Sequence, residues 1–346
     1  MRKWALAAVV LPAVLLANRS GSTELVTSPV PSIARHSAGE LSILTYNVQD
    51  LPWPLAGDRS TSLTAIGARL KIMRAAGSAP QLVVLQEGFS DNSTAMLRAA
   101  GYAHIWVGPS SSVLRNPSAE PLDASFLANR STLLGEAQAP SLSSGLVIAS
   151  DYPIRNVVGQ PFPANVCAGF DCLANKGIML ARIDVPGLAK PLDLVTTHLN
   201  AGRKSRTAEQ HNLYAYREQL KVVSRFLAAY RDPASPAIFA GDFNVSHSKK
   251  RLASLQAHQA PWGMAAVTAM GKPKYQADCV IAKAECSGPL PIAANVRLIH
   301  TLDWQFKSGD QLQPINRTIL FGKEADGGML SDHVGFAVRY RIAHQP

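Results

Sequence analysis

Long apolar runs are scarce in this sequence. The most prominent, Trp4–Ala17, follows the basic pair Arg2 and Lys3 and gives way to the polar Asn18–Ser20. It is too short to span a bilayer comfortably, although an uncleaved anchor is the alternative interpretation. A basic start, a short apolar stretch and polar residues after it are typical of a secretory signal peptide. We therefore predict a signal peptide at residues 1–22 and a secreted or periplasmic protein.

Cysteine is also scarce, with four in 346 residues. Cys167 and Cys172 form one close pair and Cys279 and Cys286 another. Neither pair has CxxC spacing and no histidine cluster accompanies them, which argues against a zinc site. In a secreted protein the spacing favours two local disulfides, while the sequence leaves the other pairings open.

Acidic residues are outnumbered: 24 Asp and Glu face 34 Lys and Arg, a formal net charge of +10. A basic surface suits anionic partners such as nucleic acid, acidic lipids or phosphorylated substrates. No run of basic residues is longer than Lys249–Arg251, so an ordinary solvated basic surface is an equal alternative.

Three catalytic signatures are absent as well. The sequence has no GxSxG elbow, no GxxxxGK[ST] loop and no HExxH motif, and "SSG" at Ser143–Gly145 does not make a nucleophile elbow. Serine hydrolases of the elbow type, P-loop enzymes and zincins are therefore disfavoured.

What is present is an alternation of short apolar runs and helical stretches. Residues 23–40 are rich in Ser, Pro and Gly and read as a flexible leader, and residues 41–346 as one catalytic domain. Alternating strands and helices indicate an α/β fold, and the half-buried pattern of the last strand indicates mixed sheets. Predicted strands are 41–48, 81–87, 144–150, 177–185, 192–199, 237–243 and 334–342; predicted helices are 59–76, 94–100 and 207–230, the last with a capping box of Thr207 and Gln210.

Polar side chains gather where these strands end. The ends supply only Asn, Glu, His and Asp, and each residue alone has a structural explanation such as a turn. Together they indicate a site on the loops at one end of the sheets. The residues are Asn47, Glu87, His198, Asp242, Asn244, Asp303, Asp332 and His333.

The residue types point to phosphate chemistry. Carboxylate and carboxamide oxygens suit Mg²⁺, with other divalent cations as alternatives, so we assign Glu87 as the direct metal ligand and Asn47 as its neighbour. The two histidines can deprotonate an attacking water and support the leaving oxygen. Asp303 or Asp332 would orient the histidine base, and the Asn244 amide would donate to a phosphate oxygen.

These motifs resemble the endonuclease/exonuclease/phosphatase superfamily, with its DNase I-like fold. The matching stretches are "TYNV", "LQEGF", "THLNAG", "AGDFNV", "TLDWQF" and "SDHVGF", in the family's order over nearly all of residues 41–342. The resemblance implies a four-layer α/β sandwich of two mixed β-sheets placed face to face.

Within the superfamily, the sequence looks most like secreted bacterial neutral sphingomyelinases, the sphingomyelinase C group, above all in "CAGFDCLANKGIMLARI". The resemblance implies hydrolysis of sphingomyelin to ceramide and phosphocholine at a membrane surface. It also implies His333 as general base, His198 near the leaving group, and Lys176 near the phosphate. Trp304 departs from the family's usual Tyr, and only Trp53 and Trp262 are candidates for interfacial aromatics.

Two other functions compete with the lipid enzyme. A secreted nuclease of the same fold would use Arg203, Lys204 and Arg206, just past "THLNAG", to bind a nucleic-acid backbone. A non-catalytic binding protein or toxin subunit conflicts with the intact set of polar residues. No obligate protein partner is evident from the sequence.

Overall fold

The computed structural model describes residues 23–26, 39–52, 57–245, 248–267, 288–290, 302–321 and 328–343. The predicted signal peptide, Trp53 and the Cys279–Cys286 pair lie outside them. None of the described helices combines the length and apolarity that a membrane span needs.

One sheet has eight strands and is mixed: β2 and β3 run parallel, and every other pair of neighbouring strands in this sheet is antiparallel. In spatial order the strands are β1 (Thr23–Val26), β4 (His104–Val107), β5 (Val147–Ser150), β3 (Leu82–Gly88), β2 (Glu40–Asp50), β14 (Gly335–Ile342), β13 (Leu312–Leu320) and β11 (Gly288–Leu290).

The second sheet has six strands and is also mixed, with β8 and β9 parallel. Its order is β10 (Ala265–Ala266), β12 (Asp303–Ser308), β9 (Ala237–Asp242), β8 (Leu192–His198), β7 (Gly177–Ile183) and β6 (Ile154–Pro161).

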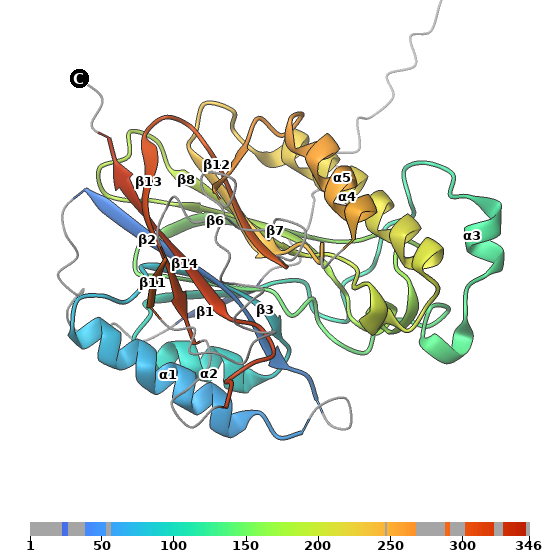
Figure 1. Cartoon of the computed structure of the whole chain (residues 1–346), viewed down its shortest axis with the longest axis horizontal. Coiled ribbons are helices and arrows are strands. Elements are labelled where there is room, and N and C mark those ends of the chain that lie inside the picture. Colours follow the sequence, from blue (N-terminus) through green and yellow to red (C-terminus); the bar gives the residue numbers. More distant parts are fainter. Residues whose placement is uncertain are drawn as a thin grey trace, which may run out of the picture.

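The helices complete four layers (Figure 1). Helices α1 (Ser60–Ala75) and α2 (Asp91–Ala99) share an apolar cluster with the eight-stranded sheet. Helices α4 (Glu209–Tyr230) and α5 (Lys249–Gln259) pack on the six-stranded sheet, and a third cluster lies between the sheets. The predicted four-layer α/β sandwich is confirmed. An excursion between β4 and β5 carries α3 (Ala124–Ala128) and the 3₁₀ turn η1 (Thr132–Leu134); further 3₁₀ turns are η2 (Gly169–Leu173) and η3 (Arg203–Ser205).

Several local predictions are confirmed and others are corrected. Gly77 follows α1 with φ +72°, a conformation that suits glycine at a helix end. The capping box at the start of α4 is wrong: Ala208 is the N-cap residue, and the hydroxyl of Thr207 contacts that of Ser205 at 3.0 Å. The segment predicted as a leader includes β1, whose backbone pairs with β4.

Two further findings concern residues singled out in the sequence. The predicted disulfide between Cys167 and Cys172 is present, and it closes the loop that contains η2. Trp262 is a core residue rather than an interfacial one, because it is 3% exposed and its indole N–H donates to Ser224 Oγ at 2.9 Å.

Candidate active site

The ends of strands from both sheets meet at one place. Asn47 on β2 donates its Nδ2 to Glu87 Oε1 on β3 at 3.0 Å and to Asp242 Oδ2 on β9 at 3.2 Å. Strands β2 and β3 belong to the eight-stranded sheet and β9 to the six-stranded one. Asn47 therefore joins the two sheets at the predicted site.

His333 enters the site just ahead of β14. Its Nδ1 lies 2.9 Å from Asp303 Oδ2, and its backbone N–H donates to Ser331 Oγ at 3.2 Å. Ser331 in turn donates its hydroxyl to the backbone carbonyl of Asn47 at 2.7 Å. Asp303 faces Asp242 across the antiparallel pair β12–β9, so backbone pairing fixes both carboxylates. His333 is thereby held from both sheets.

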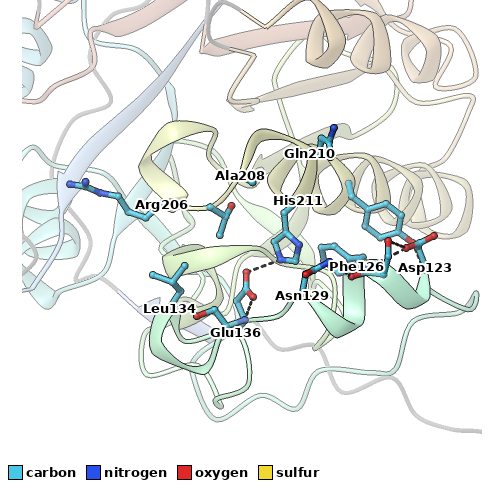
Figure 2. A pocket seen from close by; sticks show the side chains of 13 residues that line it. Asp123, Phe126, Asn129, Leu134, Glu136, Arg206, Ala208, Gln210 and His211 are labelled. Carbon is cyan, nitrogen blue, oxygen red and sulfur yellow. Dashed lines mark hydrogen bonds and ion pairs between the residues drawn. The ribbon is translucent and has the colours of Figure 1, made fainter.

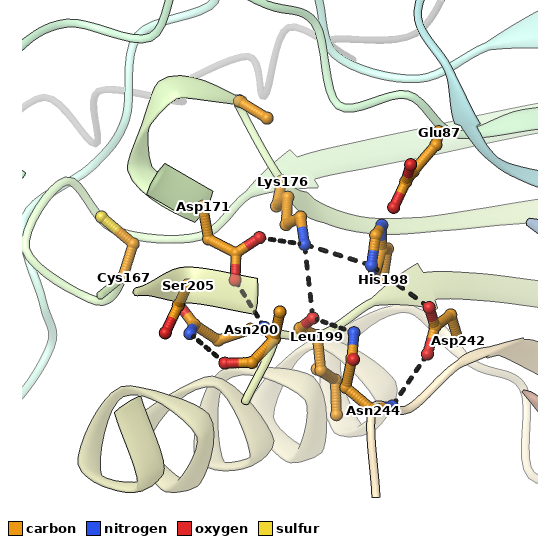
Figure 3. A network of polar contacts seen from close by, with 12 residues as sticks. Glu87, Cys167, Asp171, Lys176, His198, Leu199, Asn200, Ser205, Asp242 and Asn244 are labelled. Atoms are coloured by element: carbon orange, nitrogen blue, oxygen red, sulfur yellow. Dashed lines mark hydrogen bonds and ion pairs between the residues drawn. The ribbon is translucent and has the colours of Figure 1, made fainter. Parts of the chain in front are cut away.

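His198 occupies the end of β8, beside Asp242 (Figure 3). Its Nε2 lies 3.3 Å from Asp242 Oδ2 and 3.1 Å from Lys176 Nζ. The Lys176 ammonium also contacts Asp171 Oδ1 at 2.5 Å, and Asp171 Oδ2 accepts from the backbone N–H of Ala201 at 2.5 Å. A chain of charged groups thus connects the disulfide-closed loop to the site.

The two buried histidines are held in opposite charge states. Burial and the nearby Lys176 ammonium lower the pKa of His198 well below 6.5, so its ring is neutral. Burial also opposes charge on His333, but the Asp303 and Asp242 carboxylates outweigh it and raise the pKa of His333 to about 10. The two rings therefore lie in different electrostatic environments within one site.

The carboxylates of the site fit a divalent cation. Burial is the main cause that raises the pKa of Glu87 and of Asp242, because it disfavours the charged carboxylate. A bound cation would offset this cost of burying the charge. Asp242, Asp303 and His333 also present ligand atoms that all lie within 4.8 Å of one another. In the described part of the chain, three buried polar atoms of the site lack a hydrogen-bond partner: His198 Nδ1, Asp303 Oδ1 and Asp332 Oδ1. Carboxylate oxygens and imidazole nitrogens are ligand atoms that proteins use to bind divalent cations.

Backbone strain gathers here too. Gln49, Glu87 and Asn244 have φ values of 53°, 55° and 48°, which non-glycine residues adopt rarely. Each such residue costs about 1–3 kcal/mol and persists where its surroundings hold it. The Asn244 backbone is held by a hydrogen bond from its N–H to Asp242 Oδ1 at 2.9 Å.

The structure brings the predicted residues together but refines three roles. One hydrogen of the Asn244 amide goes to Leu199 O at 2.9 Å, which leaves the second for a phosphate. Asp303 is the partner of His333, whereas Asp332 pairs with Lys204. Lys176, predicted to contact substrate, is 6% exposed and contacts His198.

Sequence reasoning missed two contributors. Ser331 lies in "SDHVGF" and Asp171 in "CAGFDCLANKGIMLARI", but neither motif assigns these residues a role. Spacing gave no signal for either, because Asp171 reaches Lys176 through a 3₁₀ turn and Ser331 acts through backbone groups.

A separate cavity of about 720 Å³ lies between the α3–η1 excursion and the start of α4 (Figure 2). Its buried Glu136 accepts from Gly169 N at 2.5 Å and lies 2.9 Å from His211 Nε2. None of the predicted catalytic residues lines it.

Comparisons place this geometry among known folds. No family model matches the sequence, and no curated protein matches it. A beta toxin variant from Staphylococcus aureus with bound magnesium ions is 19% identical, with a TM-score of 0.58 over 86% of this chain and 99% of that one. Sphingomyelinase C from Streptomyces griseocarneus is 17% identical, with a TM-score of 0.54 over 87% and 99% of the two chains.

An endonuclease/exonuclease/phosphatase protein from Beutenbergia cavernae is 20% identical, with a TM-score of 0.55 over 88% of this chain and 72% of that one. The three matches cover 86–88% of this chain. The chain therefore has the DNase I-like fold.

Proposed function

We propose that the chain is a Mg²⁺-dependent phosphodiesterase that hydrolyses sphingomyelin to ceramide and phosphocholine. The observation that carries the proposal is the pair of buried histidines whose Nε2 atoms lie 3.3 Å and 3.8 Å from the same oxygen of Asp242. Structural likeness to a sphingomyelinase C and to a magnesium-binding toxin supports it.

His333 is the proton acceptor in this proposal. Its Nδ1 is engaged by Asp303, and its Nε2 lies 3.8 Å from Asp242, too far for a direct hydrogen bond. In the neutral form of His333, which the raised pKa makes the minor form until the pH approaches about 10, Nε2 is therefore available to take a proton from an attacking water. The imidazolium formed in that step is stabilised by the two carboxylates, as a histidine base requires.

The phosphate would lie between His333 and His198. His198 can carry only one ring proton in its neutral state, so its proton sits on one nitrogen and the other accepts. Its Nδ1 is buried without a described partner and can meet a substrate oxygen. The second hydrogen of the Asn244 amide would donate to the same group.

Glu87, oriented by Asn47, would hold the cation. When bound, the cation neutralises a non-bridging phosphate oxygen and stabilises the charge that develops on it. The Glu87 side chain is only partly buried.

Arg203, Lys204 and Arg206 favour a second candidate, a nuclease. All three side chains are exposed on or beside η3, shortly after His198 in the sequence. Lys204 also contacts Asp332, the residue before His333. Exposed cations at the rim of a phosphodiesterase site suit a nucleic-acid backbone.

The decisive experiment follows phosphocholine release from sphingomyelin liposomes by residues 23–346, with Mg²⁺ and with EDTA. We expect release that EDTA abolishes, and a loss of roughly 10²–10⁴-fold in His333→Ala. His258→Ala, which removes a histidine from helix α5, should be normal. No release by folded protein, with cleavage of plasmid DNA instead, would favour the nuclease; near-normal turnover in His333→Ala would refute the assigned base.

We also propose that the protein is secreted. The Cys167–Cys172 disulfide supports an oxidising compartment. Mass spectrometry of the protein in the culture medium would test this: an N-terminus near residue 22 is expected, and retention of the whole chain in the cells would contradict it.

A further inference from the structure

The basic run Lys249–Arg251 contains an unexpected buried member. Lys249 and Lys250 are exposed, but Arg251 in the first turn of α5 is 2% exposed. Burying a guanidinium requires that its donors be satisfied. The acceptors around Arg251 therefore indicate what this side chain does.

Arg251 donates to three separate segments. Nη1 reaches Asn200 O at 2.5 Å and Asn244 O at 3.1 Å. Nη2 reaches Ala201 O at 3.0 Å and Asn212 Oδ1, on α4, at 2.8 Å. The guanidinium also lies over the ring of Tyr216, 4.4 Å from its centre.

Two of these segments carry the candidate catalytic residues. Asn200 and Ala201 follow His198 directly after β8, while Asn244 follows Asp242 after β9. Figure 3 shows Leu199, Asn200 and Asn244 side by side at this point. Arg251, on α5, thus joins the backbones of the two loops by hydrogen bonds.

The bridge depends on the shape of the guanidinium. No described carboxylate lies in an ion pair with Arg251, so its partners are mainly backbone carbonyls. Five donors in a rigid plane can serve several acceptors at fixed angles, which an ammonium or an amide cannot. One of the acceptors belongs to Asn244, whose φ of 48° must be held against relaxation.

We propose that Arg251 is a positioning residue: it locks the loop after β8 against the loop after β9 and so sets His198 relative to Asp242 and Asn244. This inference rests on the proposed phosphodiesterase function for its kinetic consequence. The loop contacts themselves do not depend on which substrate is cleaved.

The test compares Arg251→Gln and Arg251→Lys with Lys250→Gln, a matched loss of one positive charge on the same turn of α5. We expect both Arg251 variants to lower kcat by about tenfold to a hundredfold, because displacements near 1 Å at a reacting centre have effects of that size. KM should change less than about twofold. Lys250→Gln should match the wild type.

Hydrogen exchange supplies a readout that does not need activity. We expect faster amide exchange at residues 199–201 and 243–245 in both Arg251 variants, with unchanged exchange in β2 and β3. Mg²⁺ affinity measured by calorimetry without substrate should also be unchanged, since Asn47 and Glu87 lie on the other sheet. If Arg251→Gln does not fold, Arg251→Lys, which keeps the charge, decides the question.

The outcomes separate two failures. Normal kcat per folded molecule, or exchange that rises equally throughout the domain, would overturn the positioning role. If the wild type cleaves none of the substrates, the proposed function fails, and the exchange pattern alone then decides whether Arg251 locks the loops.

Discussion

Replacing Asp303 with Asn tests the electrostatics of the site most directly. The Asp303 carboxylate lies 2.9 Å from His333 Nδ1, and at an effective dielectric constant of 20 a pair at that distance is worth about 6 kcal/mol. Raising the pKa of His333 from 6.5 to about 10 corresponds to about 5 kcal/mol. The two magnitudes agree, given that burial opposes the charge.

In Asp303→Asn the main stabilising charge is gone while the burial remains. We expect the pKa of His333 to fall well below its wild-type value of about 10. Asp332→Asn removes a carboxylate that acts on His333 only at longer range and should lower the pKa much less. Histidine resonances followed by NMR from pH 5 to pH 10.5 in EDTA would give both values, with His333→Ala to assign the signal.

The same charge makes stability depend on pH. Because the pKa of His333 is raised in the folded chain, its contribution is fully present below pH 6.5 and is lost as the pH rises to about 10. Urea titrations in EDTA should show this decline in the wild type and not in Asp303→Asn. A wild-type His333 that titrates near 6.5, or equal effects of the two Asp variants, would refute the reasoning.

Three other perturbations have clear expectations. Glu87→Gln should raise the Mg²⁺ concentration needed for half-maximal activity by at least about tenfold, since it removes the ligand charge, and an unchanged Mg²⁺ titration would count against Glu87 as a ligand. Lys176→Met removes a cation 3.1 Å from His198 Nε2, so the pKa of His198 should rise, visible by NMR; an unmoved signal would show that burial alone lowers it. The double variant Cys167→Ser/Cys172→Ser opens a short loop and should lower the free energy of unfolding by about 2 kcal/mol in urea titrations, whereas no loss would mean that packing alone holds η2.

The sequence predicts the site well where strand patterns are strong. His198 and Asp242 end buried strands and Asn47 lies near the end of another, so the strand pattern places all three toward one end of the sheets. Strands β6 and β13 escaped prediction because half-exposed residues and Pro314 break the alternation on which the prediction depends.

Other features depend on tertiary contacts that no local pattern encodes. Thr207 was expected to cap α4, but its hydroxyl contacts Ser205 instead. Arg251 looks like its exposed neighbours in the sequence, and only the carbonyls of two distant loops make it a core residue. Trp262 likewise fits a loop or a core, and the aromatic cluster of the six-stranded sheet decides between them.

The place of β14 has a consequence for when the protein becomes competent. This strand lies between β2 and β13 in the middle of the eight-stranded sheet, and Ser331 and His333 immediately precede it. A ribosome that has not yet reached residue 331 has therefore made neither the proposed base nor β14, one of the two strands beside β2. On the proposed function, chains that end before that point would lack the base and would be inactive.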